Sequence, residues 1–499
     1  MLEAFVHGLV SVFQWPAFGL MLLGVAIGFA VGILPGLGGS VTLALMLPFT
    51  FGMQPVEAFA FLLGMLSVTA TTGDITSVLF GVPGEATTAA TILDGYPMTK
   101  RGEAGRALGA ALMSSLLGAL IGAFALAAMI PIVQPLVLSL GTPEFFMLAM
   151  VGIAFVASLS GGAVRRGLIA GGLGLLLSLV GLDPQSGTQR FTFGLLYFWD
   201  GISLIPVAVG LFAIPEIVEL AVKGTSIAER RVGKLGGVWQ GVKDTFRYWG
   251  ITVRCSLLGT FVGMIPGLGG SIAQWMAYAH AVQSTPDKSR FGHGDVRGVL
   301  GPGAANNSKE GGNLITTVAF GIPSTVVMAI LLGAFLIQGL VPGPDMLTKN
   351  LDVTFSLVWI IVVTNIITVA ICFLFLNQLV KITYVRAGLL IPFLILLVFI
   401  GAFTTNNDYL DLVVMLAFGA LGWAMVALGW PRPPLVLGLV LGKLSETYLY
   451  LSVGRYDWAW LTRPLVVVLF VVALAAILHP AIEAWRGRKL RVAKPGESA

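Results

Sequence analysis

The sequence predicts an all-α, polytopic membrane protein, and its composition carries most of that prediction. Of its 499 residues, 57% are hydrophobic and only 11% are charged, whereas a soluble domain has about 25% charged residues. A chain with so little charge cannot cover a surface that faces water. Its formal net charge of +5 is typical of the basic loops that orient a membrane protein, and we expect no nucleic-acid partner.

Apolar stretches place the expected helices along the chain. A spanning helix needs roughly 20 apolar residues. The clear candidates are 17–34, 104–130, 144–160, 167–182, 202–222, 248–265, 326–341, 354–376, 387–403, 409–428 and 464–481. Shorter or interrupted apolar stretches are 41–52, 57–93, 271–283, 311–325 and 433–445. Irregular backbone in a membrane must be buried in protein or line a wet cavity. We therefore expect about 11–14 spans, with broken or re-entrant helices at the functional centre.

Charged residues indicate the orientation of these spans. Basic residues gather at four places, which are Lys100 to Arg106, Arg165 with Arg166, a linker at 223–247 and a tail at 483–499. The positive-inside rule places all four in the cytoplasm. Residues 1–16 lack the basic region and cleavage site of a signal peptide, and we expect an interfacial amphipathic helix there.

Two motifs occur twice, in the same order. Residues 32–40 read GILPGLGGS and residues 263–271 read GMIPGLGGS, with seven of nine positions identical at an offset of 231. Residues 75–83 read ITSVLFGVP and residues 315–323 read ITTVAFGIP, with six of nine identical at an offset of 240. Two motifs repeated at nearly the same offset predict two homologous halves.

The two halves are expected to be repeats of inverted topology. The loop after the second motif is basic in the first half, but in the second half it reads VPGPDMLTKNLD and is near neutral. Equivalent loops on opposite sides of the membrane mean inverted repeats, which are common in secondary transporters. The predicted organisation is an interfacial helix at 1–16, a first repeat at 17–222, a cytoplasmic linker at 223–247, a second repeat at 248–482 and a cytoplasmic tail at 483–499.

The PGLGGS motifs predict helix breaks that bind an anion. Pro ends a helix, the glycines permit close approach to a ligand, and Ser is expected to N-cap the next helix. The free N–H groups and positive dipole of that helix then bind an anion without a lysine. A kinked helix with small residues for close packing is the alternative. The candidate substrate-binding residues here are Pro35, Gly36, Gly38, Gly39, Ser40, Pro266, Gly267, Gly269, Gly270 and Ser271.

The second motif pair adds polar side chains in apolar surroundings. Hydroxyls, amides and freed carbonyls suit a dehydrated Na⁺ or a carboxylate, and an intramembrane acid such as Asp74 indicates function. N-capping of a half-helix is the alternative role of Asp74, and Glu85 belongs either to the site or to the surface. Further substrate-binding candidates are Pro83, Gly84, Asn306, Asn307, Pro323 and Ser324. The candidate cation ligands are Thr72, Asp74, Thr76, Asn313 and Thr316.

Other chemistry finds little support. Cys255 and Cys372 lie in apolar stretches and offer no disulfide framework or thiolate site. The four histidines are too scattered to hold a metal. The predicted spans contain no nucleophile–base pair, so we expect no catalytic residue, no metal, no cofactor and no enzyme. A carboxylate or anion channel and, more remotely, an intramembrane enzyme are the alternatives to a transporter.

A resemblance to a known family is carried by four segments, which read GILPGLGGSVTLALMLPFTFGMQP, FGVPGEATTAATILDGYPMTKRGEAGRALGAA, GAANNSKEGGNLITTVAFGIPS and LLGAFLIQGLVPGPDML. They resemble the large membrane subunit of tripartite tricarboxylate transporters, the TctA family. The resemblance implies a multi-pass protein of the bacterial inner membrane that imports a di- or tricarboxylate, such as citrate, by symport with Na⁺ or H⁺. It also implies two partners, a small membrane subunit and a periplasmic solute-binding protein.

Two departures from the family pattern concern the second repeat. Ser324 stands where the resemblance implies a Gly, and Gly303 stands in the region where it implies an acid before the Asn pair. One half-site is therefore expected to differ in shape. In this hypothesis the carboxylate binds between half-helix N-termini from both repeats, near the middle of the membrane.

Overall fold

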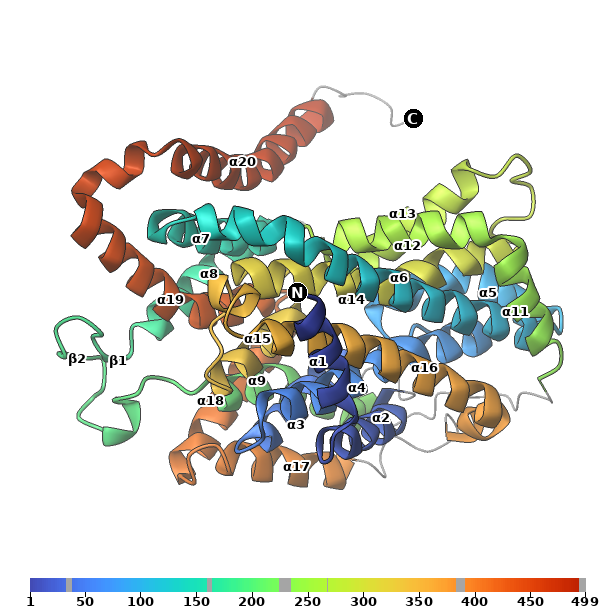
Figure 1. The fold of residues 1–499 in the computed structure, drawn as a ribbon, viewed down its shortest axis with the longest axis horizontal. Helices are drawn as coiled ribbons and strands as arrows, with labels where there is room; N and C mark the ends of the chain where they lie inside the picture. The colour runs from blue at the N-terminus through green and yellow to red at the C-terminus, as the bar shows by residue number, and fades with distance from the viewer. Residues whose placement is uncertain (33–37, 159–163, 224–234, 267, 383–390, 493–499) are drawn as a thin grey trace. The chain divides into compact units, whose positions relative to one another are not determined.

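The computed structural model describes residues 1–32, 38–158, 164–223, 235–266, 268–382 and 391–492, and these are mostly helical (Figure 1). The chain forms two compact units, each made of two segments. Unit 1 is Met1–Val137 with Ile205–Trp423, and unit 2 is Leu138–Leu204 with Ala424–Ala499. Unit 1 draws on both predicted repeats, so the units are not the repeats, and the predicted repeat boundaries stay predictions.

Unit 1 contains most of the helices. They are α1 (Leu2–Phe13), α2 (Ala17–Gly32), α3 (Gly39–Met46), η1 (Leu47–Thr50), α4 (Pro55–Phe80), η2 (Ala86–Thr91), α5 (Ile92–Lys100), α6 (Ala104–Ser139), α9 (Leu204–Ala208), η4 (Val209–Ala213, a π-helical turn), α10 (Ile214–Lys223), α11 (Val238–Arg247), α12 (Trp249–Gly263), α13 (Gly269–Gln283), α14 (Val296–Phe320), α15 (Val326–Ile337), η5 (Pro344–Leu347), α16 (Leu351–Ile382), α17 (Ile391–Phe403) and α18 (Tyr409–Ala427). The last two residues of α6, the first of α9 and the last four of α18 fall in unit 2.

Unit 2 is smaller and carries a short hairpin. Its elements are α7 (Thr142–Ser158), α8 (Val164–Ser178), β1 (Gly181–Leu182), β2 (Gln189–Arg190), η3 (Leu196–Phe198), α19 (Pro433–Tyr456), η7 (Asp457–Thr462) and α20 (Pro464–Val492). The antiparallel pair β1–β2 is tied to α19 by Arg190, whose Nη1 lies 2.6 Å from Glu446 Oε1. In the hairpin, backbone N–H groups of Ser186 and Gln185 hold the pKa of Asp183 below its ordinary value.

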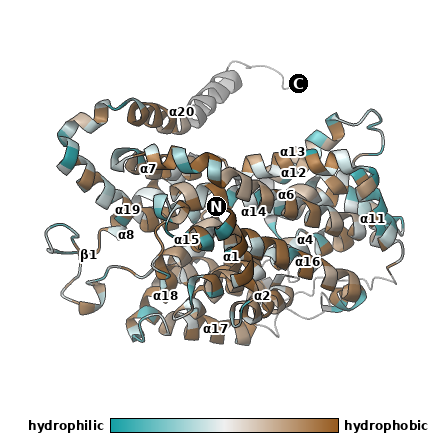
Figure 2. Ribbon diagram, viewed as in Figure 1, coloured by the Kyte–Doolittle hydropathy of each residue, from teal (hydrophilic) through white to brown (hydrophobic). Residues whose placement is uncertain are grey.

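The helices are those of a polytopic membrane protein. Within the described residues, six are long and apolar enough to cross a membrane, or seven if the bent pair α1 and α2, at 66°, forms one span. Figure 2 shows hydrophobic residues along most helices and hydrophilic ones on α11. Within the described residues, each of the eleven apolar stretches named above overlaps one or more helices. The inverted relation of the repeats and the total of about 11–14 spans stay predictions.

Two long helices, α4 and α14, form the centre of unit 1. Helix α4 packs against α2, α3 and α16, and α14 packs against α12 and α13. The interruptions expected in 57–93 and 311–325 lie after Phe80 and after Phe320, where Gly81 and Gly321 end α4 and α14, and both helices are continuous up to those points. The hydroxyls that suggested a break donate to their own helix instead, as Thr71 Oγ1 does to Ser67 O at 2.8 Å and Thr317 Oγ1 to Asn313 O at 2.7 Å. Such back-bonding leaves the helix intact.

Glycines let α6 and α14 approach at backbone distance, which gives a stability prediction. A Cβ at Gly311 would lie 2.0 Å from Gly122 O and 2.3 Å from Gly122 C. We expect Gly311→Ala to destabilise the protein by about 3 kcal/mol, because overpacking forces backbone shifts. Thermal unfolding in detergent measures this, with Gly250→Ala as the control, since nothing lies within 4 Å of that position. Equal midpoints for the two variants would contradict the close packing.

Candidate functional site

The Asn pair connects α14 to α4 in the core of unit 1. Asn306 is fully buried and Asn307 is nearly so. Asn306 Nδ2 donates to Ala70 O at 2.8 Å and to Asp74 Oδ2 at 3.2 Å. Asn307 Nδ2 donates to Thr71 Oγ1 at 2.8 Å and to Asn365 Oδ1 on α16 at 2.6 Å. The structure therefore places both amides where helices of the two predicted repeats meet.

The segment after α4 brings a carboxylate to the first glycine-rich break. Gly81 ends α4 in the left-handed conformation, with φ 68°, which turns the chain back along the helix. Glu85 then reaches the N-terminus of α3, where its Oε1 accepts the Gly39 N–H at 2.5 Å. Thr87 Oγ1 donates to Glu85 Oε2 at 3.2 Å. A helix N-terminus favours a negative charge, so the first break already holds an anion that the protein itself supplies.

The same segment reaches the second break. A Cβ at Gly270, in the first turn of α13, would lie 2.7 Å from Thr87 Cγ2, 2.7 Å from Lys309 Cε and 2.9 Å from Lys309 Nζ. Glu85 and Thr87 are two residues apart, so the N-termini of α3 and α13 both face one short segment. In the part of the chain that the structure describes, the two breaks are therefore neighbours.

Lys309 places a buried ammonium beside the second break. This side chain is 4% exposed. Its Nζ donates to Asn306 Oδ1 at 3.1 Å and lies 3.7 Å from Glu310 Oε1. An ammonium has three N–H groups to satisfy, and the dipole of α13 adds positive potential beside it. A buried amine at a helix N-terminus is a combination that binds a carboxylate.

Ser324, the first departure from the family pattern, is matched by a second change. At the offset of 240, Gly73 corresponds to Asn313 and Gly84 to Ser324. A Cβ at Gly84 would lie 2.6 Å from Gly73 Cα, whereas Ser324 Oγ donates to Asn313 Oδ1 at 2.9 Å. The predicted first repeat thus has a close backbone approach where the predicted second repeat has a hydrogen bond between side chains.

The other candidate cation ligands lie mostly against their own helix. Thr72 Oγ1 donates to Val68 O at 2.8 Å, Thr76 Oγ1 to Gly73 O at 3.1 Å, and Thr316 Oγ1 to Asn313 O at 3.2 Å. Asn313 Nδ2 donates to Glu310 Oε2 at 3.1 Å. Asp74 is the candidate with a vacant atom, because its Oδ1 accepts no hydrogen bond from the described residues. Asp74 lies inside α4, so the alternative that it N-caps a half-helix is wrong.

The remaining predicted residues divide by position. Pro35, Gly36 and Gly267 lie outside the described residues. Gly269 and Ser271 are described only as part of helix α13. The expected Ser caps are wrong: α3 begins after Gly38 and α13 after Leu268, which puts Ser40 and Ser271 inside the helices. Pro83 is exposed, Pro266 half-buried and Pro323 buried.

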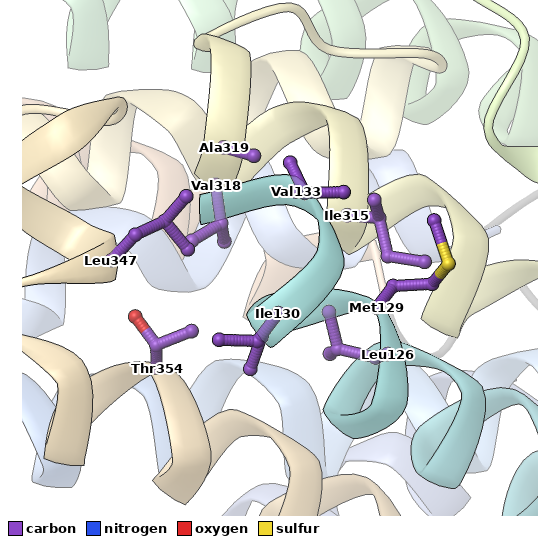
Figure 3. A pocket seen from close by; sticks show the side chains of 9 residues that line it. All are labelled: Leu126, Met129, Ile130, Val133, Ile315, Val318, Ala319, Leu347 and Thr354. Carbon is purple, nitrogen blue, oxygen red and sulfur yellow. The ribbon is translucent and has the colours of Figure 1, made fainter. Parts of the chain in front are cut away.

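A pocket in unit 1 does not suit a charged substrate. Figure 3 shows its lining, which is Leu126, Met129, Ile130, Val133, Ile315, Val318, Ala319, Leu347 and Thr354. Thr354 Oγ1, the one side-chain oxygen in this lining, donates to Met346 O at 2.6 Å. A carboxylate would lose its hydration here without gaining a partner. The polar cluster at the two breaks is the better candidate.

The second of the four segments that carry the family resemblance contains DGYPMTKRGEAGRAL, at residues 94–108, and this motif lies elsewhere in unit 1. Asp94 is buried and its Oδ1 accepts the Gly294 and Asp295 N–H groups, both at 2.8 Å. Arg101 donates to the His293 and Gly294 carbonyls. Arg106 Nε lies 2.6 Å from Asp244 Oδ2 on α11, within the predicted linker. The motif therefore holds the start of α14 and helix α11 against α5 and α6.

Sequence reasoning did not single out Lys309, and it left Glu85 open. The available signal for Lys309 was an ionisable residue shortly after the Asn pair, which indicates function in a membrane protein. Thr87 was expected at the site only as part of the segment Gly81–Thr88. Its contact with α13 follows from the fold, which brings η2 against that helix.

Comparisons with known proteins agree with the resemblance. A family model described as "Tripartite tricarboxylate transporter TctA family" matches residues 18–437. An uncharacterized 52.8 kDa protein from the TAR-I ttuC′ 3′ region of Agrobacterium vitis is 32% identical over 473 residues, which cover 94% of each chain. An uncharacterized protein from the TAR-II ttuC′ 3′ region of Agrobacterium vitis is 29% identical over 237 residues, 47% of this chain and 98% of that protein. No solved structure matches.

Proposed function

Because the chain belongs to the TctA family of tripartite tricarboxylate transporters, we propose that it is the large membrane subunit of a cation-coupled importer of a di- or tricarboxylate such as citrate. It is a component of a transporter and not an enzyme. Its proposed partners are a small membrane subunit and a periplasmic binding protein that delivers the substrate. The proposed setting is the bacterial inner membrane, with the linker 223–247 and the tail in the cytoplasm, and Na⁺ or H⁺ is the coupling ion.

The observation that carries this proposal is the meeting of both breaks at one segment. The N-terminus of α13 offers backbone N–H groups beside Lys309, and one carboxylate of the substrate binds there. The N-terminus of α3 holds Glu85. A second substrate carboxylate replaces Glu85 at that end. A dianion enters a cluster that already contains Asp74, Glu85 and Glu310 beside Lys309, so an accompanying cation offsets the added charge.

The proposal extends to the predicted architecture. Two inverted repeats that meet at this cluster would move against each other and expose it to alternate sides of the membrane. The Asn306 hydrogen bonds to α4 lie at that contact. A cation that joins the two repeats would favour the arrangement that carries substrate.

The experiment is uptake into proteoliposomes that contain this chain with its two partner subunits. We expect accumulation of a labelled carboxylate from a panel of di- and tricarboxylates, driven by a Na⁺ or H⁺ gradient. Failure with every carboxylate would overturn the substrate class. Uptake that ignores both gradients would overturn the coupling, and single-channel conductance would favour the channel.

Removing Glu85 tests whether the α3 end holds a carboxylate. Glu85→Ala leaves the Gly39 N–H without its acceptor, and we expect a loss of about 1–2 kcal/mol, the usual value of an N-terminal cap with its charge. Millimolar formate should restore the thermal midpoint of this variant and leave the wild-type protein unchanged. Glu85→Gln is the control, because its amide oxygen still accepts the N–H. Absence of a formate effect on Glu85→Ala would show that this end is not a carboxylate site.

A further inference from the structure

Three buried side chains near the two breaks keep polar atoms without partners. Asp74 is 1% exposed, and Thr91 and Gln274 are fully buried. Asp74 Oδ1, Thr91 Oγ1 and both amide atoms of Gln274 make no hydrogen bond within the described residues. The large majority of buried side-chain polar atoms in proteins have a hydrogen-bond partner, and an atom without one indicates strain, function or a missing water or ion. Several orphaned atoms at one place call for a ligand.

Contacts along α4 place Asp74 beside Thr91. The side chain of Val78 is 2.9 Å from the Cβ position of Gly95, and Thr99 Oγ1 donates to Val78 O at 2.7 Å. Asp74 lies one turn before Val78, and Thr91 lies four residues before Gly95. This register places Thr91 next to Asp74, and within the described residues neither Thr91 Oγ1 nor Asp74 Oδ1 has a hydrogen-bond partner.

Two contacts between the η2–α5 segment and α13 place Gln274 beside Thr91. Thr87 lies against Gly270, and Tyr278 OH donates to Asp94 Oδ2 at 3.0 Å. Thr91 is four residues after Thr87, and Gln274 is four residues after Gly270, so the two lie midway along the same interface of η2 and α13. Side chains of a helix lean toward its N-terminus. The Gln274 amide therefore extends toward the turn that contains Gly270.

We propose that a dehydrated monovalent cation with the chemistry of Na⁺ binds between Asp74 Oδ1, Thr91 Oγ1 and Gln274 Oε1. The three atoms are all oxygens, which hard cations prefer, and together they carry one formal negative charge. Charge favours a cation over an anion here, since an anion would face the Asp74 carboxylate in a buried setting. The site shares Asp74 with the cation ligands that the sequence predicts, but it does not use Thr72, Thr76 or Thr316, because their hydroxyls donate to carbonyls of their own helices.

The arrangement also links the cation to the substrate, and this part rests on the proposed function. Gln274 presents its Oε1 to the cation and keeps its Nε2 to donate to a carboxylate at the N-terminus of α13. Asp74 and Thr91 belong to the first predicted repeat, and Gln274 belongs to the second. A bound cation therefore holds the two repeats together and prepares the α13 end for substrate.

The test is thermal unfolding of the purified full-length chain without substrate. NaCl is titrated against choline chloride at constant ionic strength, with KCl as a second series. We expect a saturable rise in the wild-type midpoint with Na⁺ alone. Thr91→Val and Gln274→Leu should need at least 10-fold more Na⁺ for the same rise, while Thr91→Ser should keep the wild-type response because it keeps the oxygen.

Matched controls separate ligand loss from general destabilisation. Thr245→Val removes a buried hydroxyl that donates to Gly241 O in its own helix, and Gln338→Leu removes an amide that donates to Thr50 O. Both controls should respond to Na⁺ as the wild type does. A wild-type midpoint that ignores Na⁺, or Thr91→Val and Gln274→Leu curves that superimpose on the wild type, would overturn the site and leave buried water as the occupant.

The unfolding test and the uptake experiment distinguish failure of the cation site from failure of the proposed function. Carboxylate uptake driven by protons, together with no stabilisation by Na⁺, would overturn the cation site and leave the proposed function intact. Stabilisation by Na⁺ that depends on Gln274, without uptake of any carboxylate, would keep the site and overturn the substrate class.

Discussion

Replacing Lys309 by Met is expected to lower carboxylate uptake by about 10- to 100-fold, because one charge-assisted hydrogen bond is worth about 1.5–3 kcal/mol. The Lys309 ammonium lies beside Gly270 at the N-terminus of α13, where the proposed substrate carboxylate binds. Met fills a similar volume, so the variant should fold. The structural cost is the loss of the bond to Asn306 Oδ1 and of the positive charge beside Glu310. Initial rates of labelled uptake in proteoliposomes measure the effect.

Two further variants make the Lys309 result specific. Lys309→Arg keeps the charge but moves its donors, so it should retain part of the activity. Lys349→Met removes a lysine whose side chain is 75% exposed and pairs with Asp345, and it should transport at the wild-type rate. Equal uptake rates for Lys309→Met and Lys349→Met would contradict the proposal that a substrate carboxylate binds at the second break.

Much of the helical layout was predictable because apolar length and composition determine where helices lie in a membrane. The composition argument missed the continuity of α4 and α14. Polar residues in a row look like an interruption, but a Thr or Ser hydroxyl can donate to the carbonyl one turn earlier, as Thr72 does to Val68 O. The backbone then stays helical through a polar stretch.

The candidate site was predictable only in part, for a physical reason. The glycines of the two breaks stand out because they repeat at a fixed offset, and the Asn pair stands out in its apolar neighbourhood. The contacts that define the site join residues far apart in sequence, such as Asn306 with Asp74 and Thr87 with Gly270. A single sequence contains no signal for such pairs. Glu85 illustrates this limit, since its role follows from its bond to Gly39, 46 residues earlier.

Gly270→Ala is expected to reduce uptake about 10-fold or more while leaving the protein folded. The added Cβ would lie 2.7 Å from Lys309 Cε and 2.7 Å from Thr87 Cγ2. Both are side-chain atoms, and the Lys309 stem is flexible, so the clash displaces the ammonium instead of the backbone. Uptake falls because a displaced donor loses the charge-assisted bond to the carboxylate. Gly250→Ala, in open space, is the control, and its rate should match the wild type.

The double variant Gly270→Ala with Lys309→Met decides whether Gly270 acts through the lysine. If the added methyl group lowers uptake by displacing the Lys309 ammonium, it should have little further effect in a protein that lacks this ammonium. The double variant should then transport as slowly as Lys309→Met alone, because effects that share one interaction do not add. A rate equal to the product of the two separate losses would mean that Gly270 contributes independently, through its own N–H or through the shape of the break.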